Sequence, residues 1–199
     1  MKLVSTRPIP PQAEARLFAA TPNLQIVVAS TGPDSLGAFL EQVADADIVM
    51  GSYGGGAGDT FRRVVQATKS ARWIHTTSAG VDEILCPEAY DRDFILTCAK
   101  GQAVAPLLAE HAMALLLALT RCLVQAARCT SWQRHAFQDG PTEVGGMTMG
   151  IVGFGAVGQA LAKRALAFDM RVLGVRTHPS EPPPGVEAVW GVERLPDLL

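Results

Sequence analysis

Three glycines separated by one and by two residues, Gly153, Gly155 and Gly158, follow the apolar run Met149–Val152. In this spacing the first glycine permits a tight turn, the second lets backbone approach a pyrophosphate, and the third lets a helix pack closely on a strand. The helix that follows presents unpaired N–H groups and a positive dipole end to phosphates. Because a second strand is expected at Met170–Val175, the pattern predicts a dinucleotide-binding turn.

The residue after that second strand bears on the choice of dinucleotide. A carboxylate here bonds the ribose hydroxyls of NAD, whereas this chain has Arg176, followed by Thr177. A guanidinium can pair with the 2′-phosphate of NADP through two parallel hydrogen bonds. We therefore expect Arg176 and Thr177 to contact NAD(P)(H), with NADP(H) preferred. The alternative, a solvated Arg176 in a protein that uses NAD, stays open.

A second run of interest is Trp73–Asp82, in which a strand is expected to end in the small residues Ser78, Ala79 and Gly80 before a helix begins. Exposed N–H groups at such a turn can hold a carboxylate. His75 lies within the strand, where a structural role is favoured over a catalytic one. The glycine-rich segment 51–58 either lines the same cleft or is an ordinary loop.

Other titratable residues give weaker signals. Glu110 and His111 are adjacent on an expected helix, so they point about 100° apart and cannot form a direct acid–base pair. Structural or interface roles are favoured for both. His135 and His178 have no recognisable partners, and the four cysteines lack a zinc-binding spacing. We therefore expect no metal site.

Composition limits the classes of partner. The 199 residues are 48% hydrophobic and 18% charged, which indicates a packed core, and the net charge of −2 argues against nucleic acid and anionic membrane. The longest apolar run, Ala112–Leu119, is far shorter than the ~20 residues of a membrane span. The N-terminal segment is too short an apolar stretch for a signal peptide. These features predict a soluble, cytoplasmic protein.

Strand-like and helix-like segments alternate, which predicts an α/β fold with a parallel sheet covered on both faces. A long, very apolar helix is expected from Pro106 to about Cys129, buried against a sheet, a domain or a second subunit. The strands are expected at Lys2–Ser5, Leu24–Ala29, Asp47–Gly51, Arg72–Thr76, Phe94–Cys98, Thr148–Gly153, Met170–Val175 and Val186–Trp190, and the other helices at Pro11–Ala20, Asp34–Ala44, Thr60–Ala67, Gln159–Phe168 and Glu193–Leu199.

Taken together, the chain resembles the D-isomer-specific 2-hydroxyacid dehydrogenases. Three stretches carry the resemblance in the order typical of that family: Trp73–Asp82, Ala109–Leu119 and Met147–Gly158. Trp132 also fits a tryptophan common before the nucleotide-binding strand. The resemblance extends over essentially the whole chain.

The resemblance implies a flavodoxin-like substrate domain over residues 1–103 and the first half of a Rossmann domain over residues 104–199. It implies that the substrate carboxylate meets the backbone at Ala79 and Gly80, and that the pyrophosphate meets Ala156, Val157 and Gly158. It also implies a homodimer to which the Pro106–Cys129 helix contributes.

The family moves a hydride between a nicotinamide and C2 of a small 2-keto or 2-hydroxy acid, using a histidine, a glutamate and an arginine from the second half of the Rossmann domain. No counterpart of these three can be assigned here. We therefore expect a fragment of a longer enzyme that binds cofactor weakly and has no dehydrogenase activity alone. The alternative is a non-catalytic, dinucleotide-binding regulatory or interaction protein of the same fold.

Overall fold

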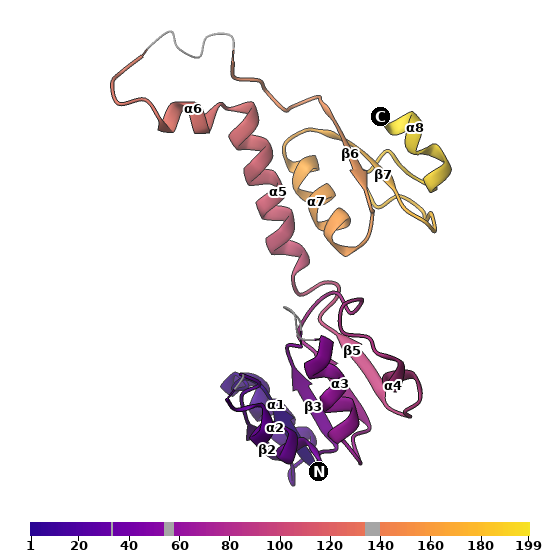
Figure 1. The fold of residues 1–199 in the computed structure, drawn as a ribbon. Helices are drawn as coiled ribbons and strands as arrows, with labels where there is room; N and C mark the ends of the chain where they lie inside the picture. The colour runs from indigo at the N-terminus through magenta and orange to yellow at the C-terminus, as the bar shows by residue number, and fades with distance from the viewer. Residues whose placement is uncertain (33, 54–57, 134–139) are drawn as a thin grey trace. The chain divides into compact units, whose positions relative to one another are not determined.

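The computed structural model describes residues 1–32, 34–53, 58–133 and 140–199. They form two compact units, Met1–Lys100 and Gly101–Leu199, each with its own sheet (Figure 1). Within the described residues, no helix is long and apolar enough to cross a membrane.

The sheet of the first unit consists of five parallel strands in the order β2-β1-β3-β4-β5. This 2-1-3-4-5 order is that of flavodoxin-like folds, so the predicted fold class is confirmed. The strands are β1 (Lys2–Ser5), β2 (Gln25–Val28), β3 (Ile48–Gly51), β4 (Trp73–Thr76) and β5 (Ile95–Cys98).

Four helices connect these strands. The predicted bounds are confirmed for α1, and α2 and α3 each lie within two residues of the predicted bounds at either end. A helix after β4 was expected without bounds. The helices are α1 (Pro11–Ala20), α2 (Leu36–Val43), α3 (Gly58–Ala67) and α4 (Pro87–Tyr90).

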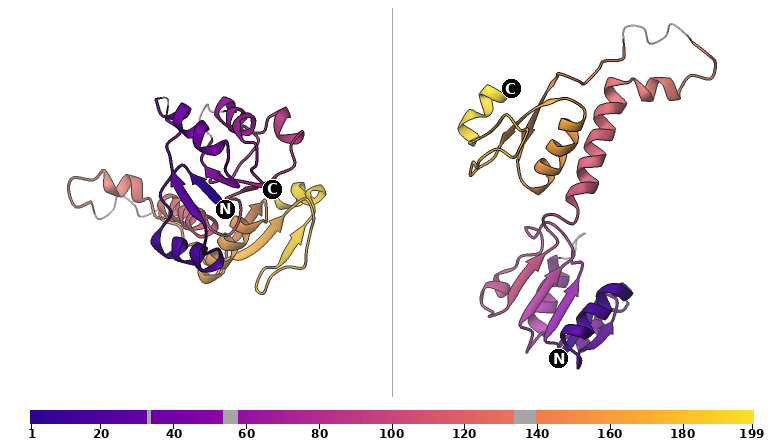
Figure 2. Two further views of the ribbon diagram at one scale, coloured as in Figure 1. Left: turned by 90° about the horizontal axis from the view of Figure 1, so that it is seen from below. Right: turned by 180° about the vertical axis from the view of Figure 1, so that it is seen from behind.

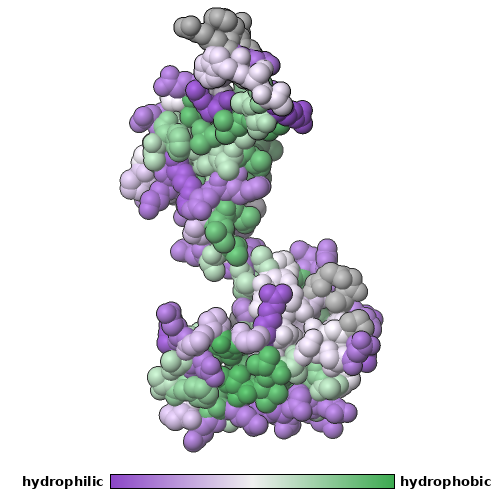
Figure 3. Space-filling model, turned by 90° about the vertical axis from the view of Figure 1, so that its left-hand side faces the viewer, coloured by the Kyte–Doolittle hydropathy of each residue, from purple (hydrophilic) through white to green (hydrophobic). Residues whose placement is uncertain are grey.

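The two faces of this sheet are covered differently. On one face Val4, Val49 and Ile74 are fully buried in a cluster with side chains of α2 and α3, such as Phe39 and Phe61. On the other face, residues of β1, β3 and β4 and of α1 surround an apolar cavity of about 630 Å³. The surface of this unit shows an extended apolar area (Figure 3).

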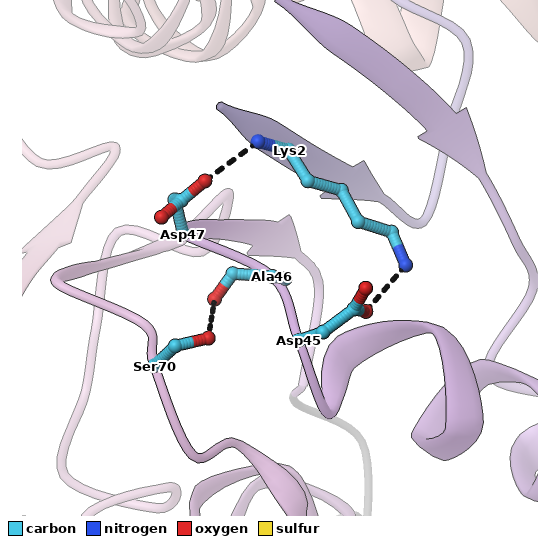
Figure 4. A network of polar contacts seen from close by, with 5 residues as sticks. All are labelled: Lys2, Asp45, Ala46, Asp47 and Ser70. Atoms are coloured by element: carbon cyan, nitrogen blue, oxygen red, sulfur yellow. Dashed lines mark hydrogen bonds and ion pairs between the residues drawn. The ribbon is translucent and has the colours of Figure 1, made fainter.

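A polar network fixes the amino ends of β1 and β3 (Figure 4). The backbone N–H of Lys2 donates a hydrogen bond to the Asp47 carboxylate at 2.7 Å, and Lys2 Nζ contacts Asp45 Oδ1 at 2.6 Å. The hydrogen bond from Lys2 lowers the pKa of Asp45. Ser70 Oγ donates to the Ala46 carbonyl at 3.1 Å, which ties the start of β4 to the same corner.

The sheet of the second unit has three parallel strands in the order β6-β7-β8, the first half of the predicted Rossmann arrangement. Helix α7 packs on it, and α5 packs on α7 (Figure 2). The elements are α5 (Ala105–Thr120), α6 (Leu123–Ala127), β6 (Thr148–Val152), α7 (Ala156–Ala167), β7 (Arg171–Val175), β8 (Ala188–Trp190), a 3-10 turn at Val192–Arg194 and α8 (Leu195–Leu198).

The predicted single helix from Pro106 to Cys129 is wrong. Helix α5 ends at Thr120, and Cys122 adopts a left-handed backbone conformation with φ 53° before α6 begins. The Thr120 hydroxyl bonds back to the Leu116 carbonyl at 2.9 Å, in competition with the regular backbone pattern. A left-handed residue cannot continue a right-handed helix, so the segment divides into two helices.

Candidate functional site

The glycine turn joins β6 to α7 through one left-handed residue. Gly153 has φ +91°, a conformation that disfavours any side chain. The amides of Gly153 and Phe154 both donate to the Val175 carbonyl of β7, at 2.8 and 3.0 Å. The turn is therefore anchored to the neighbouring strand rather than only to its own helix.

The amino end of α7 has free donors. Gly155 occupies the N-cap position without a side-chain cap, and the first turn holds no acidic residue. Among the described residues, none accepts a hydrogen bond from the amides of Ala156, Val157 or Gly158. Three unpaired N–H groups at the positive end of a helix dipole are suited to binding an anion such as a phosphate.

The second and third glycines of the turn differ in their surroundings. A Cβ added at Gly155 would meet nothing within 4 Å, so that position faces open space. A Cβ at Gly158 would lie 2.6 Å from the Gly153 carbonyl oxygen and 3.1 Å from Ile151 Cγ2. The space beside Gly155 is thus available to a ligand, whereas Gly158 is required for the helix to pack on β6.

A pocket of about 490 Å³ brings most of the predicted cofactor residues together. Gly153 and Gly155 line it on one side, and Arg176, Thr177 and His178 line it where β7 ends. The Arg176 amide donates to the Trp190 carbonyl of β8 at 3.0 Å, which fixes its backbone. The residue is half-buried, and its guanidinium makes no hydrogen bond or ion pair with another described residue. The pocket thus places a free cation beside the glycine turn.

The predicted substrate turn follows β4. The Ser78 amide donates to Thr76 Oγ1 at 3.2 Å, and the Ser78 carbonyl accepts from the Ala99 amide at 3.0 Å. Within the described residues the amides of Ala79 and Gly80 donate no hydrogen bond, and both residues are exposed. The turn is therefore held at Ser78 and leaves two donors free.

A pocket of about 300 Å³ adjoins this turn, lined by Ser78, Gly80, Asp82, Glu83 and Ile84. Ala79 does not line it, and two carboxylates do. The helix expected after the small-residue turn begins beyond Asp82, and a further turn comes first, in which the amide of Ile84 donates to the Val81 carbonyl at 3.0 Å. The next helix, α4, begins at Pro87, whose fixed φ suits a first helical position.

The histidines of this chain lack the partners of a catalytic pair. His75 Nδ1 lies 2.8 Å from Thr97 Oγ1, and the same hydroxyl accepts a hydrogen bond from Trp73 Nε1 at 2.7 Å. This contact ties β4 to β5 and agrees with a structural role. Within the described part of the chain, no histidine forms an ion pair with a carboxylate and no cluster of potential metal ligands occurs. His135 and residues 54–57 of the glycine-rich segment lie outside the described residues.

Two residues that contact each other beside the cofactor turn were not identified from the sequence. Phe154, the residue between the first two glycines, is buried with 1% exposure, and its ring lies against Gly174 of β7. The apolar residue inside a glycine turn and the glycine inside a strand were the signals available. They could not be connected without the strand register.

Comparison with known protein families gives a match to the second unit. Residues 113–198 match the NAD-binding domain of D-isomer specific 2-hydroxyacid dehydrogenases. The hydroxypyruvate reductase of Thermotoga maritima is 34% identical over 113 residues, which cover 55% of this chain and 36% of that protein. The glyoxylate reductase of Korarchaeum cryptofilum is 32% identical over 165 residues, which cover 79% of this chain and 48% of that protein.

A solved structure matches both units. The D-isomer specific 2-hydroxyacid dehydrogenase family protein from Aeromonas salmonicida is 28% identical, with a TM-score of 0.73 over 99% of this chain and 59% of that one. The chain therefore spans about half or less of the curated relatives named above and about three-fifths of this structural relative. With the parallel sheets and the glycine turn, these matches place the chain in the D-isomer-specific 2-hydroxyacid dehydrogenase family, with part of its NAD-binding domain.

Proposed function

We propose that the protein functions as part of an oxidoreductase. The enzyme acts on the CH–OH group of a small 2-hydroxy acid, or reduces the corresponding 2-keto acid, with NAD(P)(H). The observation that carries this proposal is the pocket lined by Gly155, at the N-cap of α7, and by the unpaired Arg176, within a matched NAD-binding domain. The free amides of Ala156, Val157 and Gly158 follow Gly155 directly and do not line the pocket itself. Relatives named hydroxypyruvate reductase and glyoxylate reductase support a small substrate. A bound nicotinamide would supply the hydride.

In the proposed cofactor site, the amides of Ala156, Val157 and Gly158 bind the pyrophosphate. The lack of a side chain at Gly155 leaves room for it. Arg176 and Thr177 bind the ribose end, where the guanidinium pairs with a 2′-phosphate. This pairing is the reason for proposing a preference for NADP(H), because a guanidinium and a phosphate form two parallel, charge-assisted hydrogen bonds.

The first unit is proposed as the substrate domain, with Ser78, Ala79 and Gly80 as the substrate-binding turn. The free amides of Ala79 and Gly80 are suitable donors to a single carboxylate. Asp82 and Glu83 line the adjoining pocket and would repel a second negative charge on the substrate. A small monocarboxylate, such as glyoxylate or hydroxypyruvate, fits this arrangement better than a dianion.

Titration of the 199-residue chain with NADPH and with NADH tests the cofactor proposal, with cofactor fluorescence as the measurement. We expect binding of both, tighter for NADPH, with an affinity that weakens as salt is added. Equal or tighter binding of NADH would overturn the NADP(H) preference. Binding of neither would overturn the cofactor site itself.

We further propose that this chain alone does not catalyse the reaction. Support comes from the described histidines, none of which pairs with a carboxylate in the way a proton-transfer group would be held. The test is NADPH oxidation in the presence of glyoxylate or hydroxypyruvate. Robust turnover by the 199-residue chain would refute this proposal and leave the cofactor site intact.

A homodimer through the region 106–129 is also proposed. Leu107, Leu115 and Leu119 of α5 are exposed by more than half of their surface, and Leu123 and Val124 of α6 are similarly exposed. Exposed large apolar side chains along one segment are typical of an association surface. Light scattering should give a dimer mass for the wild type and a monomer mass for Leu115→Glu. A monomeric wild type would refute the proposal.

A further inference from the structure

One row of the second sheet lacks a side chain at its centre. Ile151 of β6 pairs with Gly174 of β7, which pairs with Val189 of β8, so the three residues share one face of the sheet. Ile151 and Val189 belong to the buried cluster on that face. Gly174 leaves an unfilled position between them.

The ring of Phe154 fills this position. A Cβ placed on Gly174 would lie 2.7 Å from Phe154 Cγ and 3.1 Å from its Cβ, and closer still to Cδ2. The distances to Cγ and Cδ2 are shorter than any ordinary contact of a Cβ atom, so no residue other than glycine fits there while the ring stays in place. Phe154 is 1% exposed and is a member of the same buried cluster.

This contact lies next to the hydrogen bonds that hold the glycine turn. The carbonyl of Val175, one residue after Gly174, accepts from the amides of both Gly153 and Phe154. A ring seated on Gly174 and two hydrogen bonds to Val175 therefore fix the same short stretch of turn. The ring and the two hydrogen bonds thereby set the direction in which the first N–H groups of α7 point.

We infer that Phe154 and Gly174 are positioning residues for the dinucleotide: Phe154, seated in the gap at Gly174, holds the glycine turn in its phosphate-binding form. Gly174 does not line the cofactor pocket, and Phe154, which does, is only 1% exposed, with its ring packed on Gly174. The inference rests on the proposed function, since it concerns the same cofactor site. Gly174 thus acts with Gly153, Gly155 and Gly158 as a fourth required glycine, contributed by the neighbouring strand.

Three variants test the inference in the 199-residue chain: Gly174→Ala, Phe154→Leu, and the two combined. Gly174→Ala should weaken NADPH binding by about tenfold, because the added methyl displaces the ring and the turn moves with it. Adding Phe154→Leu should recover most of that loss, because the shorter side chain leaves room for the methyl. Gly150→Ala is the matched control, because the atoms nearest to its Cβ would belong to the movable side chain of Leu198, at 3.0 Å and beyond.

Amide hydrogen exchange without cofactor provides a second readout. In the wild type the amides of residues 153 and 154 should be protected, because both are bonded to Val175. Gly174→Ala should reduce their protection selectively, and the double variant should restore it. This measurement separates the inference from the proposed function, since it does not require the wild type to bind a cofactor.

Several outcomes would overturn the inference. One is unchanged exchange at residues 153 and 154 in Gly174→Ala, and another is a double variant that recovers neither binding nor protection. A third is an equal loss of binding in Gly150→Ala, which would indicate general destabilisation. If Gly174→Ala does not fold, Phe154→Ala replaces it, and normal protection of residue 153 in that variant would contradict the role of the ring.

Discussion

Arg164 of α7 donates a hydrogen bond from Nη2 to Glu110 Oε1 of α5 at 2.7 Å, and its Nη1 donates to the Ala160 carbonyl at 3.0 Å. Glu110 is therefore bonded across two packed helices rather than to the adjacent His111. The favoured structural role of Glu110 has a physical basis in this ion pair. The pair also holds α5 against the helix that begins at the cofactor turn.

The Glu110–Arg164 pair is expected to stabilise the fold only weakly. The Glu110 side chain is 61% exposed, so solvent screens the charges, and a coupling of about 0.2–1 kcal/mol is expected. A double-mutant cycle with Glu110→Ala and Arg164→Ala, followed by urea unfolding, measures it. The coupling should shrink in high salt, and a coupling that is insensitive to salt would contradict an electrostatic origin.

Gly155→Ala and Gly158→Ala should separate binding from stability. Alanine at 158 would meet the Gly153 carbonyl, so we expect a loss of about 1–3 kcal/mol in the free energy of unfolding. Alanine at 155 meets no protein atom, so the fold should keep its stability while the methyl obstructs the pyrophosphate. Chemical denaturation and cofactor titration of both variants check this. Equal losses of stability in the two variants would contradict the different surroundings of the two glycines.

Replacing Arg176 with alanine should weaken NADPH binding by about 10- to 100-fold and change NADH binding little, since only NADPH offers a phosphate to the guanidinium. The matched control is Arg171→Ala at the start of β7, because Arg171 pairs with Glu187 at 2.8 Å and does not line the pocket. Fluorescence titration with both cofactors is the measurement. A parallel loss for NADH would rule out a specific phosphate contact.

Tyr53 should make the protein sensitive to alkaline pH. Burial raises the pKa of this phenol well above its usual value of about 10. Because only the unfolded chain ionises Tyr53 readily, its contribution to stability is present below pH ~10 and is lost as pH rises above that value. Denaturation between pH 8 and 11 should show a steeper fall for the wild type than for Tyr53→Phe.

At neutral pH, Tyr53→Phe should leave the free energy of unfolding unchanged or raise it by up to about 1 kcal/mol. The Tyr53 hydroxyl is buried and has no hydrogen-bond partner among the described residues, while the ring packs on Phe61 with centroids 5.3 Å apart. The variant keeps the ring and removes the unpaired hydroxyl. A clear loss of stability at pH 7 would reveal a partner for that hydroxyl.

The two faces of the first sheet should respond differently to truncation. Ile74 is fully buried against α2 and α3, so Ile74→Ala should cost about 2–5 kcal/mol. Ile95 of the adjacent β5 is 66% exposed, and Ile95→Ala should change stability by less than about 0.5 kcal/mol. Thermal and urea unfolding of the two variants measure the change in the free energy of unfolding. A large loss at Ile95 would mean that this side chain is covered in solution.

The sequence allowed the alternation of elements to be predicted because each strand is a short apolar run and each helix has its own periodicity. The glycine turn was predicted for the same reason, since its three glycines, strand and helix are contiguous. The end of α5 was missed because Cys122, an ordinary residue type, adopts the left-handed conformation there. Local propensity contains no signal for that choice.

Contacts between residues of different strands were the second feature that was difficult to predict from the sequence. That Arg176 and Gly155 line one pocket followed from a known arrangement of neighbouring parallel strands, so it could be expected. The seating of Phe154 on Gly174 joins residues twenty positions apart (174 − 154) and depends on the register of β6 on β7. The free acidic side chains Asp82 and Glu83 beside the substrate turn were likewise placed only by the fold.

The contact between Phe154 and Gly174 also has an evolutionary consequence. A methyl group at position 174 is tolerated only after the ring at 154 has become smaller, so the order in which the two substitutions arise decides whether the intermediate protein functions. Descendants of this chain should therefore change the two positions together, with glycine at 174 wherever 154 remains aromatic. Two sites that are not adjacent in the sequence would then evolve under one shared constraint.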